Sequence, residues 1–358
     1  MSNTVNNITV SDTRIGSIEP LLSPDDIRGC YPTNDFQKKV VLDTRNEIEQ
    51  VLDGKSNKLV LIMGPCSIHD ITAAIDYAKF IKTLIDLYSG NIVIVMRTYF
   101  SKPRTTVGWK GLMYDPYLDG SCKINEGIVK ARKVLLDILS LGVPCSMEHL
   151  DTIGPQFFDD LLSWAAIGAR TTESQIHREL ASGISTPVGF KNGTGGSIGL
   201  AINAIESSRC PHRFMGCDSS GKISAIATTG NPYGHIILRG GTQGPNYHAG
   251  VVNSVTDLLK EKGLPSNIFI DFSHGNSDKQ FKRQLNVCDD VCEQISSGNW
   301  SIKGVMVESN LVEGRQDIGT VPLHYGMSVT DACVGIDDSI RIVNDLISAI
   351  NNRFVNNI

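Results

Sequence analysis

The sequence predicts an α/β fold, a (β/α)8 TIM barrel, and three observations support this prediction. Short runs of branched apolar residues recur eight times, and each run ends in polar residues or glycine. Amphipathic stretches of helical length separate most of these runs. Apolar strands that alternate with helices indicate a parallel sheet covered by helices. Eight such units in roughly 300 residues favour a closed barrel, with a doubly wound open sheet as the alternative.

The first predicted strand sets the pattern for the others. Residues 59–63 are apolar, Gly64 and Pro65 end the run, and Cys66 follows at the C-terminal rim. In chain order, the predicted strands cover residues 59–63, 92–97, 143–147, 167–170, 188–191, 235–238, 268–272 and 304–307. The predicted helices cover residues 36–52, 72–88, 125–141, 155–165, 174–182, 197–207, 251–262, 279–297 and 337–351.

Three segments depart from this alternation. Residues 1–45 are polar and mixed, and they predict an N-terminal extension laid on a catalytic barrel formed by residues 46–358. Residues 102–121 form a long polar connection after the second strand, and loops of this length are usually functional or mobile. Residues 210–233 hold two short β-like runs, 213–217 and 222–228, which predict a β-hairpin inserted before the sixth strand.

The composition limits the kinds of partner and the compartment. The chain is 41% hydrophobic and 20% charged, with a net charge of -5 and no strongly basic block, which argues against nucleic acid as a partner. No stretch has the length needed to span a bilayer, and the N-terminal residues lack the apolar region of a secretory signal. Nine cysteines without regular spacing indicate reduced thiols. We therefore expect a cytoplasmic protein that binds no membrane.

Charged, reactive and metal-binding residues stand at or just after the ends of the predicted strands. The C-terminal strand ends form the active-site face of this fold, so these residues are expected to converge there. They are Cys66, Arg97, Glu148, Arg170, Lys191, Arg239, His274 and Glu308.

Four of these residues are cations, namely Arg97, Arg170, Lys191 and Arg239. Like charges brought together are costly unless an anion neutralises them, and the planar guanidinium can pair with two oxygens of a phosphate or carboxylate. Any one of the four could instead close the barrel through a salt bridge. As a set they predict a substrate that carries phosphate and carboxylate. In the following loop, Lys102-Pro103-Arg104-Thr105 predicts contact with a second anionic group, with an exposed charge cluster as the alternative.

Cys66, His274 and Glu308 are possible metal ligands, with Asp331 as a fourth beyond the last strand. No close-spaced pair such as CxxC is present, so the prediction depends on the barrel bringing the strand ends together. One sulfur, one nitrogen and two carboxylates suit one divalent ion, and this donor set does not choose among Mn²⁺, Fe²⁺, Co²⁺ and Zn²⁺. The alternative is a buried cysteine beside a hydrogen-bonded histidine and glutamate.

Several motifs in register resemble the type I 3-deoxy-D-arabino-heptulosonate 7-phosphate (DAHP) synthases. They are GPCSIHD (64–70), MRTYFSKPRTTVGWKG (96–111), ARTTESQIHRELASG (169–183), PVGFKNGT (187–194), HIILRGG (235–241), DFSHGNS (271–277), GVMVESN (304–310) and YGMSVTDAC (325–333). The resemblance covers nearly the whole chain. It implies a (β/α)8 barrel with an N-terminal extension and an inserted hairpin. It also implies the condensation of phosphoenolpyruvate with erythrose 4-phosphate and water, the first step of the shikimate pathway.

The resemblance also assigns roles to individual residues. It implies one divalent metal held by Cys66, His274, Glu308 and Asp331. It implies that phosphoenolpyruvate is bound by Arg97, Ala169, Arg170, Lys191 and Arg239, and erythrose 4-phosphate by Lys102, Arg104 and Thr105. Protons and water are expected to be handled by Lys102, Glu148, Lys191 and His274. A Schiff-base aldolase that uses Lys191 and a non-catalytic sensor barrel are the alternatives.

Members of this family are commonly inhibited by an aromatic amino acid. We expect this chain to form a homodimer or homotetramer. The matching regulatory positions are Gln156, Ser185, Phe214, Gly216 and Ile226, with Asp12 supplied by the N-terminal extension of a neighbouring subunit. Glycine at position 216 leaves room for a phenol hydroxyl, so tyrosine is the predicted inhibitor. The alternative is that Gly216 serves only the hairpin backbone.

Overall fold

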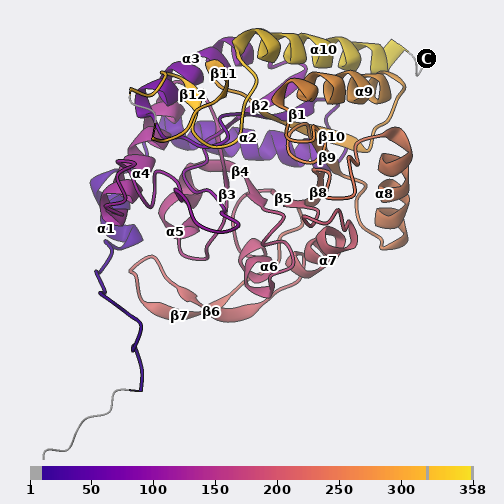
Figure 1. The fold of residues 1–358 in the computed structure, drawn as a ribbon. Helices are drawn as coiled ribbons and strands as arrows, with labels where there is room; N and C mark the ends of the chain where they lie inside the picture. Colours follow the sequence, from indigo (N-terminus) through magenta and orange to yellow (C-terminus); the bar gives the residue numbers. More distant parts are fainter. Residues whose placement is uncertain (1–9, 320–321, 356–358) are drawn as a thin grey trace, which may run out of the picture.

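Eight parallel strands close into a barrel in the computed structural model, which describes residues 10–319 and 322–355 (Figure 1). The strands follow the order β1-β10-β9-β8-β5-β4-β3-β2 around the barrel. Their bounds are β1 (Leu59–Gly64), β2 (Ile92–Arg97), β3 (Cys145–Glu148), β4 (Leu162–Ile167), β5 (Val188–Lys191), β8 (Gly234–Leu238), β9 (Ile268–Asp271) and β10 (Ile302–Glu308). The predicted TIM barrel is confirmed, and the open-sheet alternative is wrong.

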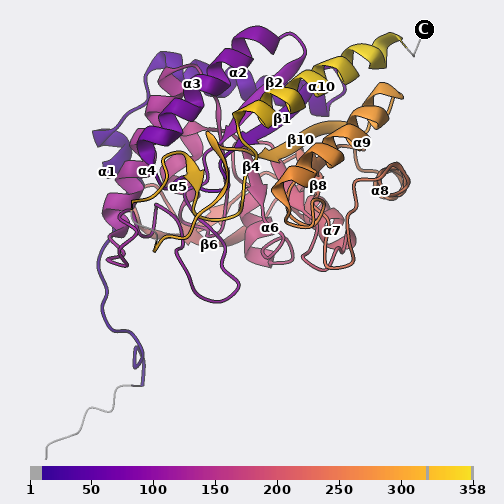
Figure 2. The same cartoon turned by 45° about the horizontal axis from the view of Figure 1, so that its top comes forward.

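Helices cover the outside of this barrel (Figures 1 and 2). They are α1 (Pro24–Cys30), α2 (Asp35–Leu52), α3 (Ile71–Tyr88), α4 (Ile124–Ser140), α5 (Pro155–Phe158), α6 (Gln175–Ala181), α7 (Gly199–Ser208), α8 (Ala249–Glu261), α9 (Gln284–Ser296) and α10 (Ile336–Val355). No helix among the residues that the structure describes is long and apolar enough to cross a membrane.

The barrel interior is filled by large apolar side chains. Trp164 of β4 and Phe269 of β9 stack with parallel rings whose centroids are 6.1 Å apart. Ile48 and Val51 of α2 belong to the same buried cluster, and the Leu52 carbonyl accepts a hydrogen bond from the Asn267 side chain. Because Asn267 directly precedes β9, the end of α2 lies against the N-terminal end of the barrel, and the opposite end is left for the site.

One predicted helix and one predicted strand are wrong. Residues 155–165 form only α5, a 3₁₀ turn at Asp159–Leu161 and the start of β4, and β4 ends at Ile167 rather than running over 167–170. Every residue of β4 is buried, and a short continuous apolar run has the same pattern in a buried strand and a buried helix. Arg170 therefore lies in the turn after β4, where the Thr171 amide donates to the Gly168 carbonyl.

The inserted hairpin consists of β6 (Arg213–Cys217) and β7 (Ile223–Ala227), which pair antiparallel at the lower edge of Figure 1. Its tip contacts the N-terminal segment, because the Asp25 amide donates to the Ser219 carbonyl at 2.8 Å. Ser23 caps α1, as its Oγ accepts from the Asp26 amide. Pro20 lies against α4, as its carbonyl accepts from Asn125 Nδ2 at 3.1 Å, and the described residues before Glu19 extend away from the barrel in both views. The start of α1 and the tip of the hairpin thus lie side by side.

Candidate active site

A cavity of about 300 Å³ opens at the C-terminal ends of the strands. It is lined by every residue predicted to bind substrate, namely Arg97, Lys102, Arg104, Thr105, Ala169, Arg170, Lys191 and Arg239. Glu148, His274, Glu308 and Asp331 line it as well. The barrel therefore brings together residues that are up to 234 positions apart in the sequence, from Arg97 to Asp331.

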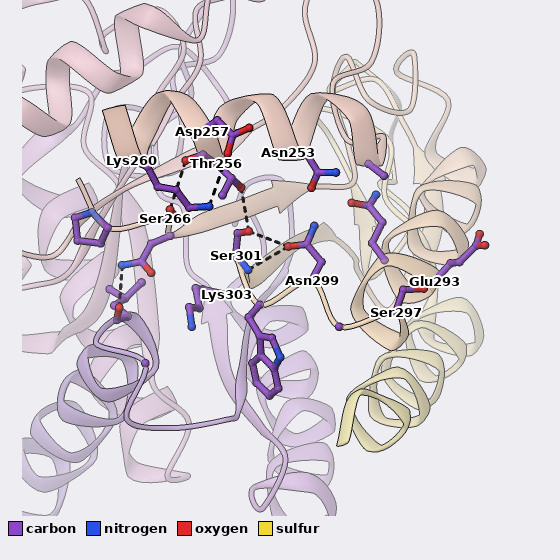
Figure 3. A pocket seen from close by; sticks show the side chains of 18 of the residues that line it. Asn253, Thr256, Asp257, Lys260, Ser266, Glu293, Ser297, Asn299, Ser301 and Lys303 are labelled. Atoms are coloured by element: carbon purple, nitrogen blue, oxygen red, sulfur yellow. Dashed lines mark hydrogen bonds and ion pairs between the residues drawn. The ribbon is translucent and has the colours of Figure 1, made fainter. Parts of the chain in front are cut away.

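A larger cavity, of about 1140 Å³, lies elsewhere, between α8 and α9 (Figure 3). Asn253, Thr256, Asp257 and Lys260 of α8 line one side, and Glu293 of α9 lies on the other. None of the predicted catalytic, substrate-binding or metal-binding residues lines it. Chemistry rather than size therefore identifies the smaller cavity as the candidate active site.

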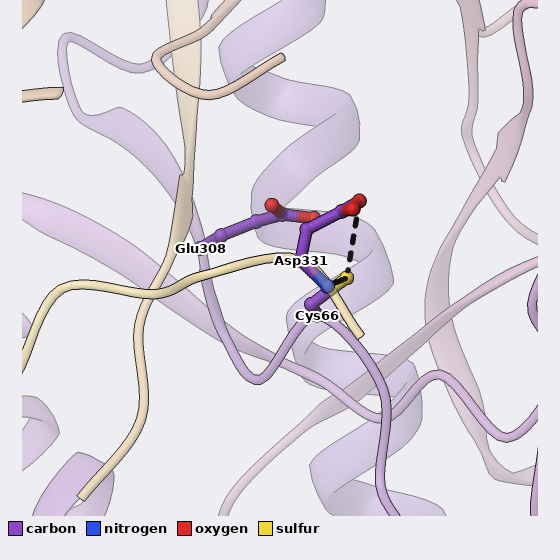
Figure 4. A group of neighbouring side chains, drawn as sticks. All are labelled: Cys66, Glu308 and Asp331. Atoms are coloured by element: carbon purple, nitrogen blue, oxygen red, sulfur yellow. Dashed lines mark hydrogen bonds between the residues drawn. The ribbon is translucent and has the colours of Figure 1, made fainter. Parts of the chain in front are cut away.

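Three predicted metal ligands converge beside this cavity (Figure 4). Donor atoms of Cys66, Glu308 and Asp331 all lie within 4.8 Å of one another. The Asp331 loop is held against the end of β1 by a hydrogen bond of 2.7 Å between the Ser67 and Thr330 hydroxyls. The fourth predicted ligand is close by, with His274 Nε2 at 3.7 Å from Glu308 Oε1.

The Lys102 ammonium lies among these donors. Its Nζ is 2.7 Å from Cys66 Sγ and 2.8 Å from Asp331 Oδ2. A cation thus bridges the thiol and the carboxylate of two predicted ligands. The resemblance predicts Lys102 as a contact to erythrose 4-phosphate, and in this structure Lys102 lines the cavity while its ammonium contacts Cys66 and Asp331.

Burial and neighbouring charges shift the pKa values of this group. Burial, followed by the nearby Glu308 carboxylate, raises the pKa of the Cys66 thiol to about 12. Burial acts to raise the pKa of Glu308 as well, but His274 and then Arg97 outweigh it and the pKa is lowered. Cys66 is therefore a thiol at neutral pH, and it must lose a proton before it binds a metal.

A buried acid that the sequence analysis missed organises the centre of the site. Asp271, the last residue of β9, is fully buried, and its Oδ2 lies 2.9 Å from His274 Nδ1 and 3.2 Å from Lys191 Nζ. Burial would raise the pKa of Asp271, but His274 and Lys191 hold it below its usual range. Asp271 stands at a strand end like the predicted residues, and that position was the signal that could have identified it.

His274 is held in an unusual backbone conformation. Its φ of 57° is in the left-handed region, which residues other than glycine rarely adopt. The Lys279 amide donates to the His274 carbonyl at 2.8 Å, which closes the turn. Such conformations persist where the surrounding structure imposes them, often at functional sites. Here the turn directs Nε2 of His274 toward Glu308 while Nδ1 contacts Asp271.

Arg97 is almost completely buried, and its donors have protein partners. Its Nη2 donates to Glu308 Oε1 at 3.1 Å, and its Nε donates to the Pro65 carbonyl at 3.3 Å. Its Nη1 lies 2.9 Å from Met306 Sδ. Arg97 therefore fixes Glu308 and contributes positive charge to the cavity floor. Arg170 is exposed, by contrast, and its Nη2 donates to Thr105 Oγ1 at 3.0 Å across the cavity mouth.

Three buried asparagines join the loops that follow β5, β8 and β9. The Asn192 side chain accepts from the Arg239 amide at 2.8 Å and from Asn246 Nδ2 at 3.1 Å. Asn276 Oδ1 accepts from the Asn246 amide, and its Nδ2 donates to the Asp271 carbonyl. Such a network, with its members satisfied, rigidifies the backbone around Lys191 and Arg239.

A separate cavity of about 540 Å³ lies between the barrel and the hairpin. Five of the six predicted regulatory residues line it, namely Gln156, Ser185, Phe214, Gly216 and Ile226. Asp12, which was predicted to come from a neighbouring subunit, is exposed and does not line this cavity in its own chain. The cavity also contains Arg28 and Asp159, and Ser185 Oγ donates to Asp159 Oδ2 at 2.6 Å.

Comparison with known proteins agrees with this geometry. Residues 37–344 match the DAHP synthetase I family. The chain belongs to the DAHP synthetase I family. It is 51% identical over 344 residues, 96% of this chain and 99% of the relative, to the Trp-sensitive phospho-2-dehydro-3-deoxyheptonate aldolase of Escherichia coli K12. It is 49% identical to the Phe-sensitive enzyme of the same strain, over 97% of this chain and 99% of the relative.

A solved member of the family has the same fold. The phospho-2-dehydro-3-deoxyheptonate aldolase of Francisella tularensis SCHU S4 superposes with a TM-score of 0.93 at 44% identity, covering 95% of this chain and 99% of that chain. The resemblance to type I DAHP synthases and the expectation of an enzyme are confirmed. Membership of the DAHP synthetase I family argues against a non-catalytic sensor barrel.

The sequence analysis missed several cavity residues of this DAHP synthase. Tyr99, Thr106, Val107, Thr194 and Lys279 line the cavity beside the predicted set. Tyr99, Thr106 and Val107 flank Lys102–Thr105 in the MRTYFSKPRTTVGWKG motif, so their position beside predicted contacts was the available signal. Lys279 was predicted as the first residue of a helix over 279–297, but it lies in the turn after His274, and α9 begins only at Gln284.

Proposed function

We propose that this chain condenses phosphoenolpyruvate with erythrose 4-phosphate and water to give DAHP and phosphate, the first step of the shikimate pathway. The observation that carries the proposal is the cavity at the strand ends, where Arg97, Arg170, Lys191 and Arg239 meet a group of metal-ligand side chains. Two anionic substrates need two groups of cations. Lys102 and Arg104, which line the same cavity, supply the second group.

One divalent metal ion is the proposed cofactor, bound by Cys66, His274, Glu308 and Asp331. The chemistry of this donor set and the Lys102 ammonium between Cys66 and Asp331 support the assignment. Such an ion supplies Lewis acidity toward a carbonyl oxygen, here that of the erythrose 4-phosphate aldehyde. Mn²⁺, Fe²⁺, Co²⁺ and Zn²⁺ are the candidates.

The chain's own residues position the reactants and manage protons. In the reaction, C3 of phosphoenolpyruvate attacks the aldehyde carbon, and the former aldehyde oxygen gains a proton. Water adds to C2 and loses a proton, and phosphate leaves with cleavage of the bond between C2 and oxygen. Among the described residues that line the cavity, Glu148 is the carboxylate outside the metal-ligand group, and we assign it the proton of the attacking water. Its Oε2 lies 3.8 Å from Lys191 Nζ. Holding both substrates in register contributes much of the acceleration.

A Schiff-base mechanism through Lys191 is the alternative. An amine nucleophile must be neutral, whereas Lys191 is buried and paired with Asp271 at 3.2 Å. This pairing supports a role in binding phosphate or carboxylate rather than nucleophilic attack. Borohydride treatment in the presence of pyruvate tests the alternative. Reduction of an imine between Lys191 and the pyruvate carbonyl would give a stable adduct, and such an adduct would replace the metal mechanism.

Regulation by an aromatic amino acid is proposed for the 540 Å³ cavity. Asp159 and Arg28 offer opposite charges to the amino and carboxylate groups of the ligand, and Phe214 and Ile226 offer apolar surface to its ring. Tyrosine is the proposed inhibitor, because Gly216 leaves space for the phenol hydroxyl. Inhibition by phenylalanine or tryptophan without inhibition by tyrosine would overturn this choice.

The remaining proposals concern organisation. Residues 1–45 are proposed to act as an extension for oligomer contacts and regulation, with residues 46–358 as the catalytic barrel and 210–233 as its inserted hairpin. The exposed residues 10–18, which extend away from the barrel, support a homodimer or homotetramer in which Asp12 reaches the 540 Å³ cavity of a neighbouring subunit. A cytoplasmic location is proposed from the reduced thiols.

The direct test is an assay of phosphate release from phosphoenolpyruvate with and without erythrose 4-phosphate. The proposal predicts release that depends on the sugar phosphate and DAHP formation in equal amount. Phosphate release that is independent of erythrose 4-phosphate, or the absence of DAHP, would overturn it.

A further inference from the structure

Tyr99 carries a buried hydroxyl that the protein leaves without a partner. The residue lies just after β2, lines the active-site cavity and is only 3% exposed. Among the described residues, no atom forms a hydrogen bond with its hydroxyl. Buried polar groups in folded proteins are nearly always paired, so an unpaired one that lines a cavity needs an explanation.

Another buried tyrosine shows how this fold treats a hydroxyl that has only a structural role. Tyr77 of α3 is completely buried, and its hydroxyl donates to Ser309 Oγ at 2.8 Å. Tyr77 does not line the active-site cavity. The two tyrosines therefore have similar burial and differ in whether the protein itself supplies a partner.

The surroundings of Tyr99 fix its ring and leave its hydroxyl available to a ligand. The Arg97 guanidinium lies over the ring at 4.1 Å from the centroid, which is a cation–π contact. Arg97 directs its own donors to Pro65, Met306 and Glu308. Burial raises the pKa of Tyr99 and outweighs the opposing effect of Arg97, so the phenol is a neutral hydrogen-bond donor at physiological pH.

We propose that the Tyr99 hydroxyl donates a hydrogen bond to an anionic oxygen of bound phosphoenolpyruvate and is a further substrate-contacting residue of this site. The inference rests on the proposed function, because it takes phosphoenolpyruvate as the ligand. The four cations neutralise the charge of this substrate, and the phenol adds a directed, uncharged donor on a ring that is already held in place. The unpaired hydroxyl is then satisfied when the substrate is bound.

The test uses Tyr99→Phe, which removes only the hydroxyl. Binding of phosphoenolpyruvate to the metal-loaded protein, measured by titration calorimetry, should weaken by about 10- to 100-fold, since a hydrogen bond to a charged group is lost. The KM for phosphoenolpyruvate should rise or kcat should fall, while the KM for erythrose 4-phosphate stays unchanged. The unfolding temperature without substrate should not fall, because the hydroxyl has no described partner to lose.

Tyr77→Phe is the matched control. It should lower the unfolding temperature and leave the affinity for phosphoenolpyruvate unchanged. If Tyr99→Phe binds phosphoenolpyruvate as the wild type does, or raises only the KM for erythrose 4-phosphate, the inference is wrong. The binding measurement needs no turnover, so its result is separate from that of the reaction assay. A wild-type protein that binds phosphoenolpyruvate but makes no DAHP would contradict the proposed function and leave this inference standing.

A second measurement keeps the size of the side chain. With 3-fluorotyrosine at position 99, the fluorine resonance should shift when phosphoenolpyruvate alone is added to the metal-loaded protein. An unchanged resonance at saturating phosphoenolpyruvate would overturn the inference even if Tyr99→Phe folds poorly.

Discussion

Lys102 Nζ lies 2.7 Å from Cys66 Sγ, so an ammonium occupies the space between two of the proposed metal ligands. The same nitrogen is 2.8 Å from Asp331 Oδ2. Burial by itself would lower the pKa of Lys102, but Cys66 and Asp331 raise it well above its usual value. A metal ion and the Lys102 ammonium therefore compete for the same donors.

This competition predicts the behaviour of Lys102→Met. Metal affinity should be unchanged or increased, because a competing cation is removed. Turnover should fall by about tenfold or more, because Lys102 is then unavailable for substrate. Lys110→Met, an exposed lysine in the same loop, is the control and should change neither quantity. Weaker metal binding in Lys102→Met would contradict the competition.

Metal binding should depend steeply on pH. The pKa of Cys66 is raised to about 12, so the thiol is protonated throughout the neutral range and the metal must displace its proton. Affinity should therefore increase as the pH rises, by about tenfold per pH unit for one displaced proton. Calorimetry in buffers of different ionisation enthalpy counts the protons released when the metal binds. The measurement is made between pH 6.5 and 8, roughly the range in which metal-ligand histidines are neutral. Release of no proton in this range would be inconsistent with Cys66 as a ligand.

Asp271→Asn should affect both folding and metal binding. The substitution removes the carboxylate that contacts His274 at 2.9 Å and Lys191 at 3.2 Å, and leaves the buried Lys191 ammonium with the more distant Glu148 carboxylate at 3.8 Å. We expect a loss of about 3–5 kcal/mol in the free energy of unfolding. We also expect metal affinity to fall by about 10- to 100-fold, since Asp271 orients a ligand histidine. Asp278→Asn, an exposed acid in the following turn, serves as control in denaturant unfolding and metal titration.

The fold could be predicted from the sequence where a run of branched apolar residues is bounded by polar residues or glycine. The bounds of β2 and β5 agree with the predicted residues 92–97 and 188–191. β4 was misplaced because its residues are all buried, so apolar and polar residues do not alternate along it. Only the packing of Trp164 against Phe269 inside the barrel distinguishes this strand from a buried helix.

The candidate site was predictable where motifs and strand ends coincide, as at Cys66, Lys191 and Glu308. Asp271 and the orientation of Lys102 were not, because both depend on which side chains the closed barrel brings into contact. The unpaired hydroxyl of Tyr99 is likewise a property of packing, and no sequence pattern records that a buried group lacks a partner.

Gly216→Ser tests the choice of inhibitor. A Cβ at position 216 would lie 2.8 Å from Ile226 Cγ1 and 3.5 Å from a Phe214 ring carbon, so a side chain there takes space from the 540 Å³ cavity that we propose binds the inhibitor. We expect tyrosine inhibition to weaken by about tenfold or more and the preference to move toward phenylalanine. Gly250→Ser on α8, where a Cβ meets no atom within 4 Å, should leave inhibition unchanged. Unaltered tyrosine inhibition in Gly216→Ser would contradict the assignment.

Activity as a function of bound metal tests the central claim most directly. The chelated protein is titrated with Mn²⁺, bound metal is counted, and DAHP formation is measured at each step, with Cys66→Ala treated in parallel. The account predicts no activity after chelation, recovery that is complete at one ion per chain, and little metal bound or activity recovered in Cys66→Ala. Full turnover in the metal-free protein, or metal-restored wild-type turnover in Cys66→Ala, would contradict it.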